Sequence, residues 1–180
     1  MTTINEFSNA FGQGQRATLF RVEGIIPGSS RSGNSQNRQF FIKAAQLPAS
    51  TIGFIEVPYK GRKVKRPGDR TFAEWTLTVL QDENNLIRED FIEWMNRIND
   101  HEMITGDSVT ESLFPSWSLT ALKQDDSHAD GRDTTVDIFN CFPTEVGTIE
   151  FNYETVDTFT EFTVTLQYDY WTSTGAPGVS

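Results

Sequence analysis

The sequence predicts a mainly β fold of the α+β class, on three observations. Apolar and polar residues alternate with a period of two in many short stretches, one longer stretch has helical spacing, and one Gly separates two β-like runs that carry a basic cluster. Alternation places every second side chain on one face of a strand, whereas apolar residues three and four apart share a helix face. We therefore expect a sheet-dominated protein with one helix and one protruding hairpin.

The clearest strand signal is FTVTLQYDYW at residues 162–171, where Phe162, Val164 and Leu166 share one face and polar residues occupy the other. This pattern is typical of a half-buried strand. Similar stretches predict strands at 18–25, 38–45, 52–59, 74–81, 116–123, 134–142 and 147–154.

One segment breaks the alternation and predicts an amphipathic helix at about 84–99. Its apolar residues recur at helical spacing, and possible N-caps precede them at Asp82, Asn84 or Asn85. These apolar residues are Ile87, Phe91, Trp94, Met95 and Ile98. Residues 1–15 are predicted to form an N-terminal arm or a short helix.

The stretch EVPYKGRKVKR predicts a protruding β-hairpin at about 50–67 with its tip near Gly61. Residues 59–70 carry six basic groups against the single acid Asp69, a net charge of +5. The whole chain has a formal charge of −10, so the remainder carries −15. A basic hairpin on an acidic protein raises the question of what acidic surface it contacts.

The length of 180 residues fits a single domain, 1–180, which ends in a Gly- and Ser-containing stretch, 172–180, that we expect to be a flexible tail. No apolar run approaches the ~20 residues that span a bilayer, so we expect no membrane contact. Cys141 is the only cysteine, and its apolar neighbours predict a buried, inert thiol.

Catalytic, metal and cofactor signals are weak. Neither His101 nor His128 lies in a nucleophile motif, and the polar loop 124–133 imitates an EF-hand only poorly, because His128 occupies an oxygen-ligand position. We therefore predict a protein that is not an enzyme and has no cofactor and no metal. A small-ligand-binding β-barrel remains a distant alternative, since aromatic stripes can line a pocket.

Four patterns occur in order: KAAQLPAS (43–50), GDRTFAEWTLTVL (68–80), FPTEVGTIEF (142–151) and FTVTLQYDYW (162–171). Together they resemble the tail tube proteins of T-even-like contractile bacteriophages, over most of residues 16–171. The motif residues are Leu47, Pro48, Asp69, Arg70, Phe72, Trp75, Pro143, Gly147, Tyr168, Asp169, Tyr170 and Trp171.

The resemblance implies a twisted antiparallel β-sandwich or small barrel whose copies form hexameric rings that stack into a tube. The implied location is the virion tail, assembled in the host cytoplasm. The implied partners are other copies of the chain, a sheath protein, a baseplate initiator, a tail terminator, a tape measure protein and transiting double-stranded DNA. Alternatives within this superfamily are a baseplate tube initiator and a contractile-injection or type VI secretion tube protein. The polar insert 27–38 and the loop 124–133 depart from the phage pattern.

Two sets of interface residues are predicted. The hairpin cations are expected to contact the adjacent ring; they are Lys60, Arg62, Lys63, Lys65 and Arg66. The polar faces of the strands near 74–80 and 162–170 are expected to line the channel, through Thr76, Thr78, Thr163, Thr165, Gln167 and Asp169. Because 15 acids and only two basic groups follow residue 99, an acidic channel is also expected, along which DNA slides without binding.

Overall fold

The structure is a computed structural model that describes residues 3–11, 15–28, 41–102, 106, 111–122, 134–153 and 158–174. Its helices are α1 (Ile4–Phe11), α2 (Leu86–Ile98) and the 3-10 turn η2 (Glu111–Leu113). Its strands are β1 (Phe20–Glu23), β2 (Ile42–Ala45), β3 (Ser50–Tyr59), β4 (Arg62–Phe72), β5 (Trp75–Leu80), β6 (Trp117–Ala121), β7 (Thr134–Phe139), β8 (Phe142–Val146), β9 (Glu161–Gln167) and β10 (Tyr170–Thr174).

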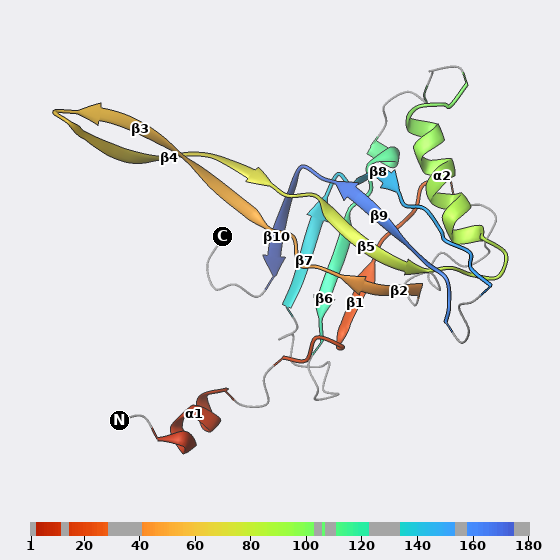
Figure 1. Cartoon of the computed structure of the whole chain (residues 1–180), viewed down its shortest axis with the longest axis horizontal. Coiled ribbons are helices and arrows are strands. Elements are labelled where there is room, and N and C mark those ends of the chain that lie inside the picture. The colour runs from red at the N-terminus through yellow and green to blue at the C-terminus, as the bar shows by residue number, and fades with distance from the viewer. Residues whose placement is uncertain are drawn as a thin grey trace.

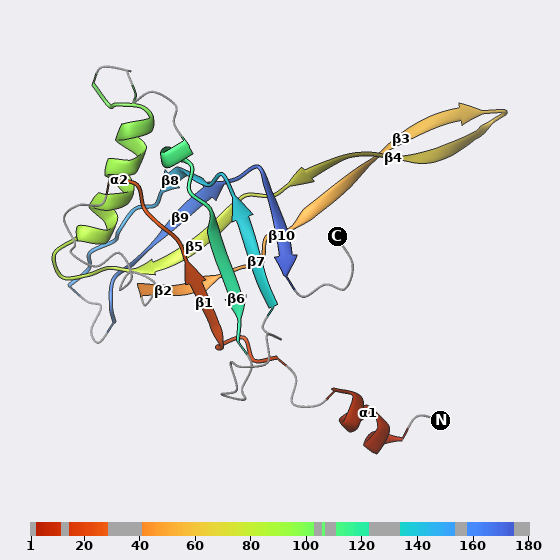
Figure 2. The ribbon, with the colours of Figure 1, turned by 180° about the vertical axis from the view of Figure 1, so that it is seen from behind.

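Eight of these strands form two four-stranded sheets, in the orders β1-β6-β7-β10 and β2-β5-β9-β8. Figures 1 and 2, which view the chain from opposite sides, show one sheet behind the other. Every pairing in both sheets is antiparallel. The predicted antiparallel sandwich is therefore confirmed, in the sandwich form rather than the barrel form.

The core lies between the sheets and follows from the alternation. Trp75, Leu77 and Val79 of β5 are 1%, 0% and 1% exposed, and across the register Leu77 pairs with Val164 of β9. Trp117 of β6 stacks on Trp94 of α2, with ring centroids 6.5 Å apart. Large rings contribute much of the buried area of such a core. Six aromatic side chains are buried in the described part of the chain: Trp75, Phe91, Trp94, Trp117, Phe162 and Tyr168.

Helix α2 closes one end of the sandwich against β8 and η2 (Figure 1). Its buried residues include Ile87, Phe91 and Trp94, which confirms the helical spacing seen in the sequence. The Asp82 carboxylate accepts hydrogen bonds from the backbone N–H groups of Leu86 and Ile87, at 3.2 and 3.3 Å. Of the candidate caps, Asp82 therefore satisfies the first free donors of the helix.

Two predicted strand boundaries are wrong. The stretch 134–142 is two strands, β7 and β8, and the stretch 162–171 is also two, β9 and β10. Residues 172–174, assigned to the flexible tail, belong to β10, where they pair with β7. A break occurs at each place because the chain crosses from one sheet to the other there, which alternation alone does not reveal.

The predicted strand at 147–154 is also wrong, since residues 147–153 lie outside any strand. Phe151 and Tyr153 alternate with polar residues but are 80% and 107% exposed. They cover no core in the described part of the chain, and their alternation reflects no sheet pairing there. Most of the insert 27–38, the loop 124–133 and residues 175–180 lie outside the described residues.

Candidate assembly interface

The hairpin β3–β4 is built on a two-residue turn. Lys60 and Gly61 both have positive φ, 46° and 79°, and Tyr59 pairs with Arg62. Positive φ at both central residues is the type I′ geometry, whose twist matches that of the two strands. The predicted tip at Gly61 is confirmed, and the hairpin extends to Phe72, five residues beyond its predicted end.

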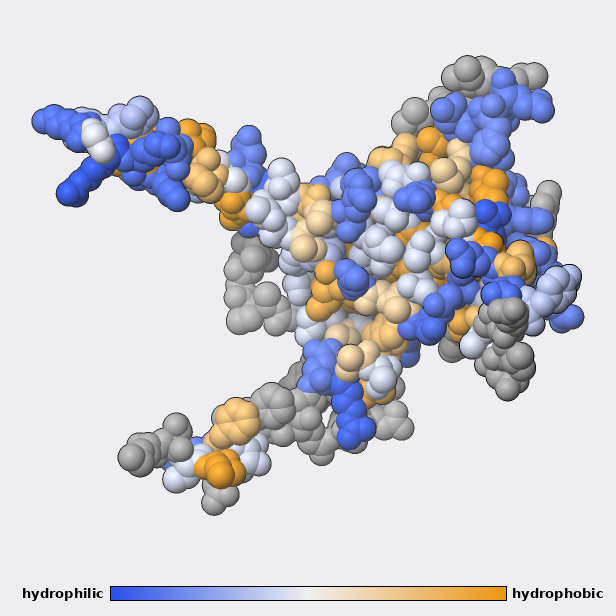
Figure 3. Space-filling view, viewed as in Figure 1, coloured by the Kyte–Doolittle hydropathy of each residue, from blue (hydrophilic) through white to orange (hydrophobic). Residues whose placement is uncertain are grey.

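The shaft of the hairpin projects from the sandwich without covering it (Figure 1). All ten residues of β3 are exposed. The large apolar side chains of the two strands are exposed as well, with exposed fractions that run from 42% for Val64 to 63% for Tyr59. Figure 3 shows apolar surface along the shaft and hydrophilic surface at its tip. A two-stranded hairpin in water is marginally stable, and this one leaves its apolar side chains uncovered by the described part of the chain.

The register divides the side chains of the distal hairpin between two faces, because residues paired across an antiparallel ladder share a face. We call one the mixed face; it carries Phe54, Glu56, Pro58, Lys63, Lys65 and Pro67. We call the other the apolar face; it carries Ile55, Val57, Tyr59, Arg62, Val64 and Arg66.

The five predicted contact cations therefore differ in their surroundings. On the mixed face, Lys63 forms a 2.6 Å ion pair with Glu56, and the Lys65 ammonium lies 4.6 Å from the centre of the Phe54 ring. At the tip, Lys60 lies 5.5 Å from the centre of the Tyr59 ring. On the apolar face, within the described part of the chain, Arg62 and Arg66 have no ion-pair partner. These two guanidinium groups are the cations most available to another molecule.

Several motif residues hold the root of the hairpin. The Trp75 indole N–H donates to the Gln46 carbonyl at 2.7 Å, and the Phe72 ring lies 6.0 Å from the Tyr168 ring. Pro48, beside this root, is buried, while Leu47 is 59% exposed. The root is thus anchored on the sandwich core while the shaft is free.

Asp69 and Arg70 of β4 are exposed. No ion pair joins them in the described part of the chain, since neighbours along a strand point to opposite faces.

The remaining motif residues shape the turns of the sandwich. Gly147 follows β8, and a Cβ there would come within 2.5 Å of the Thr163 hydroxyl oxygen. Asp169 lies in the turn after β9, not in the strand as predicted, and its carboxylate accepts a 2.6 Å hydrogen bond from the Asn140 amide. Pro143 is buried, Tyr170 stacks on Phe139, and Trp171 is half-buried.

Five of the six predicted channel residues share one face of the sheet β2-β5-β9-β8, on the side away from the core, and the sixth, Asp169, lies in the turn after β9. Thr76 pairs with Thr165, and Thr78 pairs with Thr163. Gln167, on the same face, donates a 3.1 Å hydrogen bond to Glu74. The sheet therefore presents a polar face of Thr and Gln, while the alternate residues of the same strands form the core.

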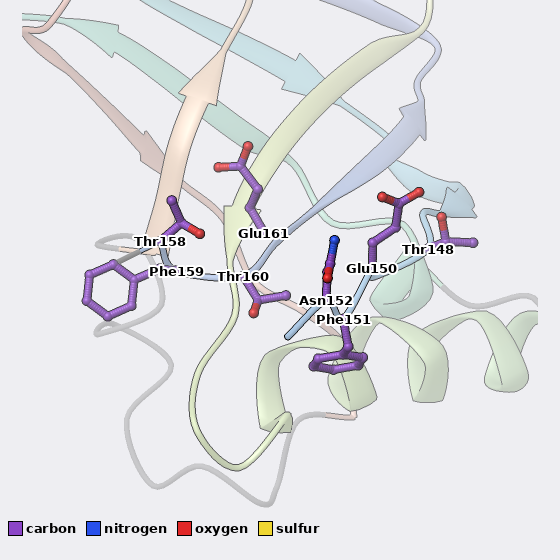
Figure 4. A pocket seen from close by; sticks show the side chains of 8 residues that line it. All are labelled: Thr148, Glu150, Phe151, Asn152, Thr158, Phe159, Thr160 and Glu161. Carbon is purple, nitrogen blue, oxygen red and sulfur yellow. The ribbon is translucent and has the colours of Figure 1, made fainter. Parts of the chain in front are cut away.

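At the other end of the molecule from the hairpin tip (Figure 1), residues on both sides of the gap between β8 and β9 line a hollow of about 510 Å³ (Figure 4). We call it the aromatic hollow; it is lined by Thr148, Glu150, Phe151, Asn152, Thr158, Phe159, Thr160 and Glu161. Phe151 and Phe159 are 80% and 87% exposed. This site was not predicted, because the alternation around Phe151 resembles that of a strand.

The single thiol is buried as predicted. Cys141 is 0% exposed, and burial raises its pKa to about 12. Its Sγ donates a weak 3.6 Å hydrogen bond to the Ile138 carbonyl. In the described residues no cluster of metal-ligating side chains occurs, and His101 is exposed. None of the described helices is long and apolar enough to cross a membrane.

A sandwich with a buried core, an exposed apolar and basic hairpin and a polar sheet face is an architecture that suits a structural protein. The comparison with known families shows which kind of structural protein it is. The chain belongs to the phage tail tube protein family, whose model matches residues 5–174. It is thus a structural component of the virion tail from a non-enzymatic family, as the sequence motifs predicted.

The curated relatives agree along nearly the whole chain. The tail tube protein of Enterobacteria phage T6 is 31% identical over 172 residues, which cover 93% of this chain and 98% of the relative. That of Enterobacteria phage T4 is 30% identical over the same shares. The tail tube protein of Serratia phage KSP90 is 28% identical, covering 93% and 95%.

Solved structures share the fold at lower identity. A protein of the anti-feeding prophage baseplate has a TM-score of 0.65 at 10% identity, covering 92% of this chain and 99% of its own. A chain of the sheath-tube complex of the extracellular contractile injection system PVC has a TM-score of 0.59 at 15% identity, covering 97% and 99%. Their likeness supports the fold.

Proposed function

We propose that this chain forms hexameric rings that stack head to tail into the inner tube of a contractile phage tail, the conduit for genome delivery. The observation that carries the proposal is the hairpin, whose exposed apolar and basic side chains are not covered by the described part of the chain. A head-to-tail contact between two different faces repeats without limit, which is what a tube requires. Family membership supports the same assembly.

The hairpin is the proposed contact between rings. Its tip region carries +5, whereas the rest of the chain carries −15, so one copy attracts the hairpin of another. Arg62 and Arg66 supply the unpaired charge, and Ile55, Val57 and Val64 supply apolar area on the same face. The contact with Lys60, Lys63 and Lys65 is secondary, because these three already have partners within the hairpin.

Ring closure is proposed to use the edges of the two sheets. The edge strands are β1 and β10 in one sheet and β2 and β8 in the other. Unpaired strand edges expose backbone donors and acceptors that template pairing with another chain. Lateral neighbours in a ring satisfy those groups and remove the aggregation risk.

The polar face of the sheet β2-β5-β9-β8 is proposed to line the channel. Besides Thr76, Thr78, Thr163, Thr165 and Gln167 it carries three acids, Glu74, Glu145 and Glu161, against one base, Lys43, which pairs with Glu161. Acidic groups repel phosphate and the neutral hydroxyl groups release no counterions on contact with it, so double-stranded DNA slides past this face. Asp169, in the turn after β9, adds one further acid at the end of this face.

The proposed partners follow from the position of such a tube. A sheath protein surrounds it, a baseplate initiator and a tail terminator bind its two ends, and a tape measure protein and then DNA occupy its lumen. The structures that share the fold come from a sheath-tube complex, a tube terminator and a baseplate, which supports this set. Assembly is proposed to occur in the host cytoplasm before virion release.

The test is size-exclusion chromatography with negative-stain electron microscopy of the purified chain over a range of concentrations. Rings, or tubes with a continuous central channel, are the expected result. A folded monomer at every concentration, with or without a bound small ligand, would reject the tube assignment.

A further inference from the structure

The hairpin β3–β4 presents two long strand edges to solvent, one on each outer side. Every residue of β3 is exposed, and Figure 1 shows both strands projecting clear of the sandwich. The stretch 52–59 is rich in β-branched and aromatic residues, of which Ile55 and Tyr59 are 59% and 63% exposed. Exposed edges of this composition template the addition of further strands and lead to aggregation. The hairpin would therefore be an aggregation site unless its edges were blocked.

The turn determines which backbone groups lie on the outer edges. Tyr59 and Arg62 flank the type I′ turn, and the pair that flanks a two-residue turn exchanges both of its hydrogen bonds. Hydrogen-bonded and non-hydrogen-bonded pairs alternate along an antiparallel ladder, so the second, fourth and sixth pairs from the turn direct their backbone polar groups outward. These pairs are Pro58–Lys63, Glu56–Lys65 and Phe54–Pro67.

Each outer edge thus has a proline at an outward position, Pro58 on β3 and Pro67 on β4. Both residues are exposed. Because the N–H that proline lacks would have pointed outward, neither residue costs the hairpin a hydrogen bond between its own strands. Each one removes a donor from the outer edge instead, and its ring occupies space that an added strand would fill.

A bulge limits the straight part of these edges. The register of the two strands shifts between Ile52 and Phe54. Gly53 lies between them, and a Cβ at Gly68 on the facing strand would come within 3.3 Å of the Gly53 backbone. A bulge bends its strand, so the straight edges run only from this point to the turn. One proline therefore lies on each straight edge, near the tip on β3 and next to the bulge on β4.

We propose that Pro58 and Pro67 block the two outer edges of the hairpin and so keep free chains from adding to one another strand by strand. Charged side chains at the other outward positions, Glu56 on β3 and Lys65 on β4, act in the same direction. The faces of the hairpin stay open to side-chain contacts, because only its edges are blocked. The proposal concerns the free chain and does not depend on the assembly that the chain later forms.

Moving the prolines tests the proposal. Pro58→Thr and Pro67→Thr are combined in one chain, the open-edge variant, which regains one outward donor on each edge. A matched control carries the same two changes together with Glu56→Pro and Lys65→Pro, at positions that pair across the ladder. The control keeps the net charge and the proline content of the wild type, and it again lacks one outward donor on each edge.

The readouts are the protein left in solution after sedimentation, thioflavin T fluorescence and negative-stain microscopy, which separates fibrils from hollow tubes. The open-edge variant should form thioflavin-positive fibrils and be roughly tenfold less soluble than the wild type. One regained hydrogen bond per added strand, together with the relieved clash, is worth about that factor. The control should behave as the wild type does.

Circular dichroism and urea unfolding check that the sandwich of each variant is intact. If the folded open-edge variant stays as soluble as the wild type, the prolines do not protect the edges. The same conclusion would follow if the control formed fibrils as readily as the open-edge variant, or if the sediment bound no thioflavin T.

Discussion

The sandwich and the hairpin treat their apolar residues in opposite ways. In the sandwich, Leu77, Val164 and Leu166 are 0% exposed, whereas in the hairpin Phe54 and Ile55 are 61% and 59% exposed. The sequence pattern predicts alternating strands in both regions, so the local pattern does not show which strands are buried and which are exposed. The difference teaches that the sandwich is stabilised within one chain, while the apolar residues of the hairpin contribute only when another molecule covers them.

The largest effect on folding is expected from the sandwich. Phe162→Ala removes a side chain that is 2% exposed and leaves a cavity, so it should lower the free energy of unfolding by about 3–5 kcal/mol. The matched change in the hairpin, Phe54→Ala, should cost within about 0.5 kcal/mol, since its ring lies in solvent. Urea unfolding of both variants measures this. An equal decrease in the free energy of unfolding for the two variants would contradict the difference in burial between the regions.

The buried thiol gives a smaller, pH-dependent effect. The pKa of Cys141 is about 12 in the folded chain against 9.0 for the free group. The thiol therefore contributes stability that is complete below pH 9 and is lost as the pH rises toward 12, because only the unfolded chain ionises in that window. At pH 10 the loss is on the order of 1 kcal/mol.

The measurement is the difference in urea midpoint between pH 8 and pH 10 for the wild type and for Cys141→Ala. The variant should lack this component of the alkaline loss. An identical pH dependence in both proteins would show that the thiol ionises as readily in the folded state.

Much of the sandwich is predictable from sequence, because every second side chain of a core strand is buried against a neighbouring element, and this burial produces the alternation. The alternation of β5 and β9 and the helical spacing of Phe91 and Trp94 report burial directly. The segment 147–153 shows the limit: Phe151 and Tyr153 alternate as strand residues do, but their alternation serves no core of this chain.

The candidate site was predictable only in part. The Gly between two β-like runs located the hairpin and its tip, and the cation count marked it as a contact surface, since both are local properties. Sequence could not show that Lys63 is held by Glu56 while Arg66 is unpaired, because this depends on cross-strand register. The aromatic hollow was missed, since it depends on how two segments fold together after β8 and before β9.

Charge reversal sharpens the comparison within the hairpin itself. Arg62→Glu with Arg66→Glu changes cations of the apolar face, and Lys63→Glu with Lys65→Glu changes cations of the mixed face. Each exposed pair is worth up to about 1 kcal/mol, and the loss is multiplied by the number of copies in a ring. The arginine variant should lose stacking at lower salt than the lysine variant, as followed by sedimentation of tubes across a salt series. The reverse order would place the contact on the mixed face.

The smallest effect on folding is expected on the polar face of β5 and β9. Thr76→Lys with Thr163→Lys changes two exposed positions and should alter the free energy of unfolding by about 0.5 kcal/mol or less. In assembled tubes, however, the added cations should bind duplex DNA at physiological salt, where wild-type tubes do not. Filter binding measures the difference. Unchanged DNA binding by assembled variant tubes would show that this face lies outside the lumen.

The central claim, that the uncovered apolar face of the hairpin is an assembly surface, is tested most directly by one comparison in the electron microscope. Ile55→Ser, Val57→Ser and Val64→Ser are combined in one chain, and the wild type is imaged beside it at the same concentration after circular dichroism shows both to be folded. We predict stacked tubes from the wild type and only single rings or monomers from the variant. Tubes of normal length from the folded variant would contradict the account.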